Sequence, residues 1–424
     1  MEDKKWDLAA LASIPLIMTL GNSMLIPILP QISQQLHVSP LQVSMLITIY
    51  AVVAILLIPI AGYLSDRFGR KTVIIPSLII ASVGGAVSGG AALMTGGITA
   101  YWIILAGRFL QGIGAAGAFP IVLPLVGDMF KEEDDVSKSL GIVETSNTFG
   151  KVLSPILGAL LASVLWYLPF LSIPVLCIIS MLLVLFFVKI PKKKSQSDHS
   201  IRQFLSDTKS ILRERGKWLY AIFAVGGISM FILFGVLFYL SETLETKYNL
   251  HGVVKGLVLA IPLAVLCLAS FVAGKMIGKN KKRMKWTSFA GMTLLTVSLV
   301  ITGFSSQIIF VIVFFSLCGA GIGTVLPCMD ALITEGIEQK QRGTITSLYS
   351  SMRFIGVSIG PPAVSLLMKA NHWVLFVVMA IAGAVGGLLT LFAVKPEEES
   401  KTDNQAEIKT GPEVGLLMMR DKVR

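Results

Sequence analysis

The stretch GYLSDRFGRK, residues 62–71, lies between two hydrophobic runs. Four of its last six residues are charged, and glycines stand at its first position and at position 69. Glycine adopts backbone conformations that other residues avoid, so it permits a tight turn. The stretch therefore predicts a short, charged connection between two hydrophobic helices.

The composition is that of a membrane protein. Of the 424 residues, 54% are hydrophobic and 14% are charged, whereas soluble proteins carry about 25% charged residues. Hydrophobic runs of roughly 20 residues, the length that a helix needs to cross a bilayer, recur along the whole chain. We therefore expect an all-α integral membrane protein. The four cysteines lie inside these runs at spacings that match no metal motif or disulfide framework, so no metal is predicted.

Twelve such runs predict twelve membrane-spanning helices. Their approximate limits are 8–30, 43–64, 72–94, 101–127, 140–163, 165–188, 218–240, 254–274, 287–304, 307–332, 345–368 and 373–394. With the N-terminus inside, the cytoplasmic segments hold thirty of the 36 Lys and Arg residues. An excess of basic residues in the cytoplasmic loops is typical of membrane proteins, so both termini are predicted to be cytoplasmic. This distribution also explains the net charge of +11 without a nucleic-acid partner.

A long polar interruption divides the chain into two halves of six spans. We predict an N-terminal half over 1–188, a cytoplasmic linker over 189–217, a C-terminal half over 218–394 and a disordered cytoplasmic tail over 395–424. In the linker, the sequence IRQFLSDTKSILRERGK predicts an amphipathic helix on the membrane surface, and a solvated linker is the alternative. Its apolar face consists of Ile201, Phe204, Leu205, Ile211 and Leu212.

The two halves repeat each other. LQGIGAAGAFP (110–120) matches LCGAGIGTVLP (317–327), and GKVLSP (150–155) matches GVSIGP (356–361) at nearly the same offset. Parallel six-span repeats related by an axis along the membrane normal are the plan of one large transporter fold. The repeats therefore predict two pseudo-symmetric six-helix halves.

The opening stretch resembles the signature loop between spans 2 and 3 of the major facilitator superfamily, with the pattern G-x-x-x-D-R-x-G-R-K. The matching residues are Gly62, Asp66, Arg67, Gly69, Arg70 and Lys71. The resemblance implies a cytoplasmic latch in which Asp66 faces the N-terminal end of span 11, where the helix dipole favours a carboxylate. Arg70 is expected to pair with Asp128 at the end of span 4.

Span 5 resembles a motif of the drug:proton antiporter branch of this superfamily, which has the pattern G-x8-G-x3-G-P-x2-G. The corresponding residues are Gly141, Gly150, Ser154, Pro155 and Gly158, with serine in place of one glycine. The resemblance implies a seal between the halves that limits leak in an antiporter. Ordinary packing of small residues is the alternative. GNSMLIPILP (21–30) in the first span resembles the same branch.

Charged residues inside membrane spans are costly and commonly functional. Arg108 matches a basic residue that proton-coupled exporters of this branch place in span 4, where it would tune a neighbouring carboxylate. The alternative is a structural arginine bonded to carbonyl groups. Glu144 and Asp330 are the acids well inside the spans and hence the candidate proton carriers. The latter could also be a solvated helix end, and none of the four histidines is a convincing relay.

Lys151 and Arg353 lie near the middle of repeat-related spans, at ~1.5 Å rise per residue. With Asn22, Gln111 and Asn147 they form the predicted substrate cavity. Because the spans hold more positive than negative charge, we expect a neutral or anionic amphiphile. The alternative is that the charged residues form salt bridges between spans, including a Glu144–Lys151 network, without contacting substrate.

The resemblance to multidrug exporters of the Bacillus type and to exporters of catechol siderophores such as bacillibactin implies a monomeric, proton-coupled efflux transporter in the bacterial cell membrane. It would export drugs or amphiphilic metabolites by alternating access and would need no cofactor beyond the proton gradient. A dedicated exporter of one anionic metabolite, such as a catechol siderophore, is one alternative, and a nutrient importer is another. The motifs of an intramembrane enzyme and of an ATP-binding loop are absent from the sequence.

Overall fold

The computed structural model describes residues 4–130, 133–188, 216–277, 280–337, 339–369 and 371–394. The predicted amphipathic helix and the tail after Val394 lie outside these residues. The helices of the first half are α1 (Lys5–Ser23), η2 (Ile26–Ile28), α2 (Leu29–Leu36), α3 (Pro40–Phe68), α4 (Arg70–Met94), α5 (Gly97–Met129), α6 (Glu133–Val164) and α7 (Leu168–Phe187). Those of the second half are α9 (Gly216–Thr246), α10 (Gly252–Ile277), α11 (Lys281–Thr302), α12 (Ile308–Gly336), α13 (Gln339–Leu367) and α14 (His372–Phe392).

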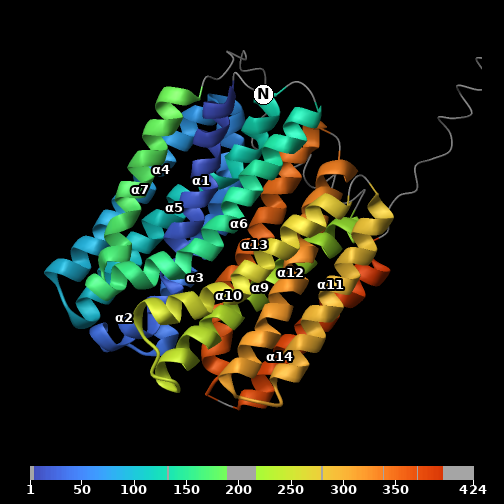
Figure 1. Cartoon of the computed structure of the whole chain (residues 1–424). Helices are drawn as coiled ribbons and strands as arrows, with labels where there is room; N and C mark the ends of the chain where they lie inside the picture. The colour runs from blue at the N-terminus through green and yellow to red at the C-terminus, as the bar shows by residue number, and fades with distance from the viewer. Residues whose placement is uncertain are drawn as a thin grey trace, which may run out of the picture. The chain divides into compact units, whose positions relative to one another are not determined.

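These helices run lengthwise through one bundle, with most helices of the first half on the left of Figure 1 and most of the second half on the right. Eleven of the described helical segments are long and apolar enough to cross a membrane. The twelfth segment, α13, is more polar but packs lengthwise against α3 and α9. The prediction of an all-α fold with twelve membrane helices is confirmed.

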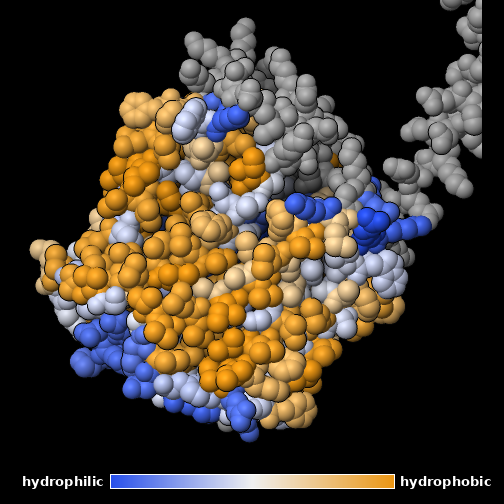
Figure 2. Space-filling view, in the orientation of Figure 1, coloured by the Kyte–Doolittle hydropathy of each residue, from blue (hydrophilic) through white to orange (hydrophobic). Residues whose placement is uncertain are grey.

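The outer surface of the bundle is apolar. Figure 2 shows hydrophobic side chains covering most of the visible face, with polar side chains gathered toward its ends. Large residues such as Leu56, Phe186 and Ile309 expose more than half of their surface. A patch of this size is not found on a soluble monomer, and lipid is the solvent that suits it.

The repeat predicted from the glycine motifs is visible in the packing. A Cβ added at Gly112 of α5 would lie 2.6 Å from the carbonyl oxygen of Tyr50 in α3, and one at Gly319 of α12 would lie 2.5 Å from that of Pro262 in α10. Small residues at such crossings let membrane helices approach backbone to backbone. The same motif therefore holds the fourth span of each half against the second.

The first span is longer than predicted and is broken. It runs from Lys5 to Leu36 as α1, η2 and α2, and the break falls at the PILP sequence, with Pro27 and Pro30 at the starts of η2 and α2. Proline has no N–H and clashes with the preceding turn, which ends a regular helix. The Ile26 carbonyl accepts from the Leu29 N–H, but it lacks the donor that an α-helix would supply from residue 30, which is proline, so it can accept a second hydrogen bond from outside its own helix.

Candidate transport pathway

Hydrogen bonds join the two halves toward the end of the bundle remote from the N-terminus, which we call the outer end. The Ser241 hydroxyl of α9 donates to the carbonyl of Ile26 at 2.8 Å. Thr48 of α3 likewise donates to the carbonyl of Ser358 in α13 at 2.8 Å. Two hydrogen bonds from side chains to main chain therefore join the halves at this end.

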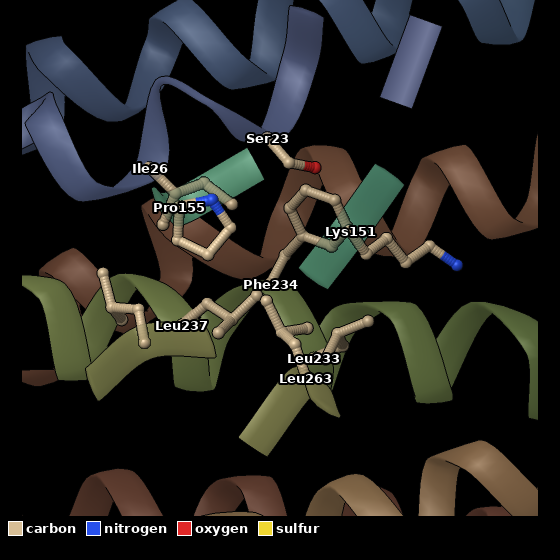
Figure 3. Close-up of a pocket in the computed structure, with 9 residues that line it drawn as sticks. Ser23, Ile26, Lys151, Pro155, Leu233, Phe234, Leu237 and Leu263 are labelled. Carbon is tan, nitrogen blue, oxygen red and sulfur yellow. The ribbon is translucent and has the colours of Figure 1, made fainter. Parts of the chain in front are cut away.

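A cavity lies between the halves just inside these contacts. It is lined by Ser23, Ile26, Lys151, Pro155, Leu233, Phe234, Leu237, Leu259 and Leu263, which come from α1, η2, α6, α9 and α10. Its volume is about 10 Å³, room for about one water molecule. The structure therefore shows this cavity collapsed around apolar side chains, with the lining in Figure 3.

Lys151 is the charged residue of the lining. Its side chain is 7% exposed, and in Figure 3 its ammonium points away from Ile26 and Leu237. Among the described residues, no carboxylate lies within the 4 Å that defines an ion pair with it, although Glu144, Asp330 and Arg353 are near enough to act electrostatically. The predicted cavity role of Lys151 is compatible with this position.

The predicted Glu144–Lys151 network is not a direct pair. Asn147 instead donates its side-chain amide to the Glu144 carboxylate at 3.1 Å and 3.3 Å. The Asn147 carbonyl accepts from the Thr19 hydroxyl of α1. Asn147 therefore ties Glu144 to the first span, a role that its predicted place in the cavity did not include.

The predicted substrate residue Arg353 lies next to the predicted proton carrier Asp330. Their side chains form an ion pair at 3.5 Å between α13 and α12, and that of Asp330 is 32% exposed. For Arg353 the structure thus favours the salt-bridge alternative over substrate contact. For Asp330 it favours a paired carboxylate over a solvated helix end.

Arg108 is fully buried and bonded to neutral acceptors. Its guanidinium donates to the Leu46 carbonyl at 2.9 Å and to the side-chain oxygens of Gln111 and Asn22, each at 2.5 Å. It also lies over the Tyr50 ring, 4.5 Å from the centroid. The carboxylate partner expected for this arginine is not among the described residues around it, so the structural alternative fits better. Gln111 and Asn22 are its acceptors, and neither is among the residues lining the cavity in Figure 3.

The signature loop forms a small ion network. Arg70 pairs with Asp66 at 2.6 Å and with Asp128 at 3.3 Å, so the expected pairing with Asp128 is present. Lys71 donates to the carbonyls of Leu185 and Val188, at 3.0 Å each, which caps the C-terminal end of α7.

The two glycines of the loop have separate uses. Gly69 has φ of +98°, which favours glycine, and joins α3 to α4. A Cβ at Gly62 would lie 3.6 Å from the Ser347 hydroxyl of α13. The first side chains of α13 lie outside the described residues, so contact between Asp66 and that helix end, and the latch itself, stay predictions. Arg67 lies beside this network and donates to the Tyr63 hydroxyl at 3.3 Å.

The span 5 motif divides its contacts between the halves. A Cβ at Gly158 would lie 2.2 Å from the Met24 carbonyl, and one at Gly150 would lie 3.0 Å from that of Leu16, so both glycines pack α6 against the first span of the same half. Ser154 donates to the Gly150 carbonyl within α6.

The residue of the motif that contacts the other half is Pro155. Its carbonyl lies against Gly256 of α10, where a Cβ would come within 2.4 Å. Gly141 has open space around its Cα. The small-residue packing alternative therefore describes Gly150 and Gly158, while Pro155 supplies a contact between the halves that is compatible with the predicted seal.

One buried ion pair escaped the sequence analysis. Glu245 and Lys255 lie 2.7 Å apart, with side chains 6% and 2% exposed. The predicted spans ended at 240 and began again at 254, which placed Glu245 in a loop and Lys255 at a membrane surface. A signal was available in the sequence, since Glu245 and Lys255 lie only ten residues apart, on either side of the connection between those two spans.

The comparisons with known proteins agree with this architecture. The sequence profile of the Major Facilitator Superfamily matches residues 11–361 and 285–422. The chain is 54% identical to the bacillibactin exporter of Bacillus subtilis (strain 168) over 93% of this chain and 98% of that protein. It is 25% identical to multidrug resistance protein 2 of the same organism over 88% and 91%.

The crystal structure of the human organic anion transporter MFSD10 (TETRAN) is similar in fold. The TM-score is 0.73 at 16% identity, with 91% of this chain and 99% of that chain covered. The resemblance read from the signature loop is confirmed. The chain belongs to the Major Facilitator Superfamily, whose members are membrane transporters and not enzymes.

Proposed function

We propose that this protein exports an anionic catechol siderophore of the bacillibactin type from the cell in exchange for protons. The observation that carries the proposal is the 54% identity with the bacillibactin exporter over 98% of that protein's length. An identity of that extent spans both halves and hence the whole pathway between them. The proposal places the dedicated metabolite exporter ahead of the broad drug exporter that the sequence motifs favoured.

The charge of the cavity supports an anionic substrate. Arg353 is engaged by Asp330 and Arg108 by neutral acceptors, which leaves Lys151 as the cation in the lining. A catechol siderophore is acidic, and the attraction between opposite charges about 4 Å apart rises from about 1 kcal/mol in water to about 4 kcal/mol at an effective dielectric constant of 20. An apolar lining with one cation suits an amphiphilic anion.

The collapsed cavity implies movement, because about 10 Å³ cannot hold a siderophore. We propose that the halves rock about the cavity, with the outer-end contacts closed in the present conformation. In this proposal the outer end faces the outside of a bacterial cell membrane, both termini are cytoplasmic, the transporter is a monomer and the proton gradient drives it.

The test is export from cells that carry a deletion of this gene. Under iron limitation, catechol siderophore is measured by mass spectrometry in the medium and inside the cells. We expect it to accumulate inside the mutant and to return to the medium with the wild-type gene. Unchanged secretion would contradict the siderophore proposal.

A drug exporter is the second candidate, since most cavity-lining residues are apolar and relatives at 25–26% identity are resistance proteins for multiple drugs or tetracycline. The same deletion strain decides between them through its sensitivity to a cationic dye, a neutral antibiotic and tetracycline. Increased sensitivity together with normal siderophore secretion would favour the drug reading.

A further inference from the structure

A buried ionic cluster lies at the outer end of the second half, apart from the cavity lining. Glu245, near the end of α9, is paired with Lys255, in the first turn of α10, at 2.7 Å. Both residues are almost completely removed from solvent. An ion pair out of water is held at a large desolvation cost, so a change in its charge balance has large consequences.

Two further titratable groups face this pair. Glu242, one turn before Glu245, acts electrostatically on both Lys255 and Glu245. The His251 ring lies with Nδ1 3.7 Å from the Glu245 carboxylate, and its Nε2 is bonded to Asn249 at 2.8 Å. The histidine side chain is 54% exposed and connects the cluster to water. With neutral His251, two carboxylates share one lysine and the cluster carries one uncompensated negative charge.

The described elements that flank the cluster hold few other titratable groups, among them His37 after α2 and Lys369 after α13. The segments η2 and α2 contain no titratable side chain, and α6 beyond Lys151 contains no charged one. Lys247 and Tyr248 are bonded to Ser306. On the α14 side, His372 is bonded to Tyr239.

The cluster sits between the contacts that close the outer end. Ser241, which donates to Ile26 of the first half, immediately precedes Glu242. Gly256, which packs against the Pro155 carbonyl of the first half, immediately follows Lys255. Separation of the halves at this end would expose the Glu245–Lys255 pair to water, and closure buries the pair.

We propose that Glu242, Glu245, Lys255 and His251 form a proton-binding site that controls closure of the outer end. One proton from the outer solvent, taken up by the His251 imidazole or by a carboxylate, cancels the uncompensated charge, and no other bond changes. Burying a neutral cluster costs less than burying a charged one, so proton binding favours the closed outer end. The site rests on the proposed membrane orientation and on alternating access, and it does not depend on which substrate is carried.

The test measures opening directly, without transport. Leu237, buried in the cavity lining, is replaced by cysteine in a chain whose four native cysteines have been replaced by serine. Intact cells are treated with a membrane-impermeant maleimide at external pH from 8 to 5. Each rate is divided by that of an exposed reference cysteine, T95C, at the same pH, because the reactive thiolate itself becomes rarer as the pH falls. We expect the labelling of L237C, so corrected, to slow by roughly tenfold as the pH falls, a change equivalent to about 1.4 kcal/mol.

In Glu242→Gln, which removes the uncompensated charge, we expect slow labelling at every pH. Lys247→Gln is the matched control and should keep the wild-type profile, because it changes a nearby residue bonded outside the cluster. A pH-independent rate in the wild-type background, or an unchanged profile in Glu242→Gln, would overturn the proposal. Since no substrate is present, either result is independent of the siderophore test.

Discussion

Gly256 of α10 lies against the main-chain carbonyl of Pro155 in α6, so closely that a methyl group at position 256 would come within 2.4 Å of the oxygen. The contact is between backbones of opposite halves, and neither side can move away without shifting a whole helix. It therefore defines how tightly the outer end can close.

Gly256→Ala should hold the outer end apart. We expect at least a tenfold loss of export, since a shift of about 1.4 kcal/mol against the closed state changes its population relative to the open state tenfold. Maleimide labelling of L237C from outside should rise. Gly274→Ala is the control, because Gly274 lies in the same helix with open space around it. Equal export by the two variants would show that the contact does not limit closure.

Lys151→Gln should weaken export of an anionic substrate by about tenfold while changing export of a neutral one little, because ~1.4 kcal/mol of lost attraction suffices. Arg353→Gln is the matched comparison. It removes the cation that pairs with the partly buried Asp330 carboxylate, so we expect it to lower stability and to reduce export of both substrates alike. The measurement is transport of one anionic and one neutral compound into inverted vesicles.

The Lys151→Gln, Glu144→Gln double variant distinguishes substrate contact from a salt bridge. Because no direct pair joins these residues, we expect the double variant to stay defective for the anion. Recovery of general activity in the double variant would count against substrate contact.

Arg108→Ala should destabilise the protein. It removes the donor from the buried oxygens of Asn22, Gln111 and Leu46, and each buried group left unsatisfied costs about 1–3 kcal/mol. Arg108→Lys should recover only part of this loss, since lysine lacks the planar fork of donors. Thermal unfolding in detergent measures the effect. A variant that melts like the wild type but has lost only proton-driven export would restore the coupling role first expected for this arginine.

Asp66→Asn should reduce export at least tenfold while leaving substrate affinity nearly unchanged, since the loop lies away from the cavity and is predicted to control alternation. The ion pairs of Arg70 with Asp66 and Asp128 are partly exposed, and such pairs contribute about 0–1 kcal/mol to stability. A drop in export together with a normal melting curve is thus the expected combination. Normal turnover in Asp66→Asn would remove the latch.

The fold was largely predictable because it depends on patterns local in the sequence. Span length, the basic loops and the glycine motifs each act within one helix or its neighbour. The repeat was visible because Gly112 and Gly319 serve the same backbone contact in their halves. The ends of the spans were less predictable, since hydropathy does not mark where a helix stops once neighbouring helices cover its polar residues.

The site was less predictable because charge and partner lie far apart in the chain. The sequence shows that Arg108 is buried in a span, but its acceptor Asn22 lies in another helix, 86 residues away. The same holds for Asp330 and Arg353, whose pairing depends on how α12 and α13 cross. Lys255 was misplaced for the related reason that its partner lies beyond the predicted end of the preceding span.

Only one partner of the hydrogen bond from Ser241 to the Ile26 carbonyl can be removed by substitution. Its acceptor belongs to the peptide backbone, so no substitution at position 26 removes it, whereas nearly any change at position 241 removes the donor. The acceptor is open to this second donor because residue 30 is proline, which has no N–H to bond the carbonyl as an α-helix would, so a residue with an N–H at position 30 that restored a regular helix would compete for it. A random screen for variants with a loosened outer end should therefore recover changes at 241 and 30 and pass over 26.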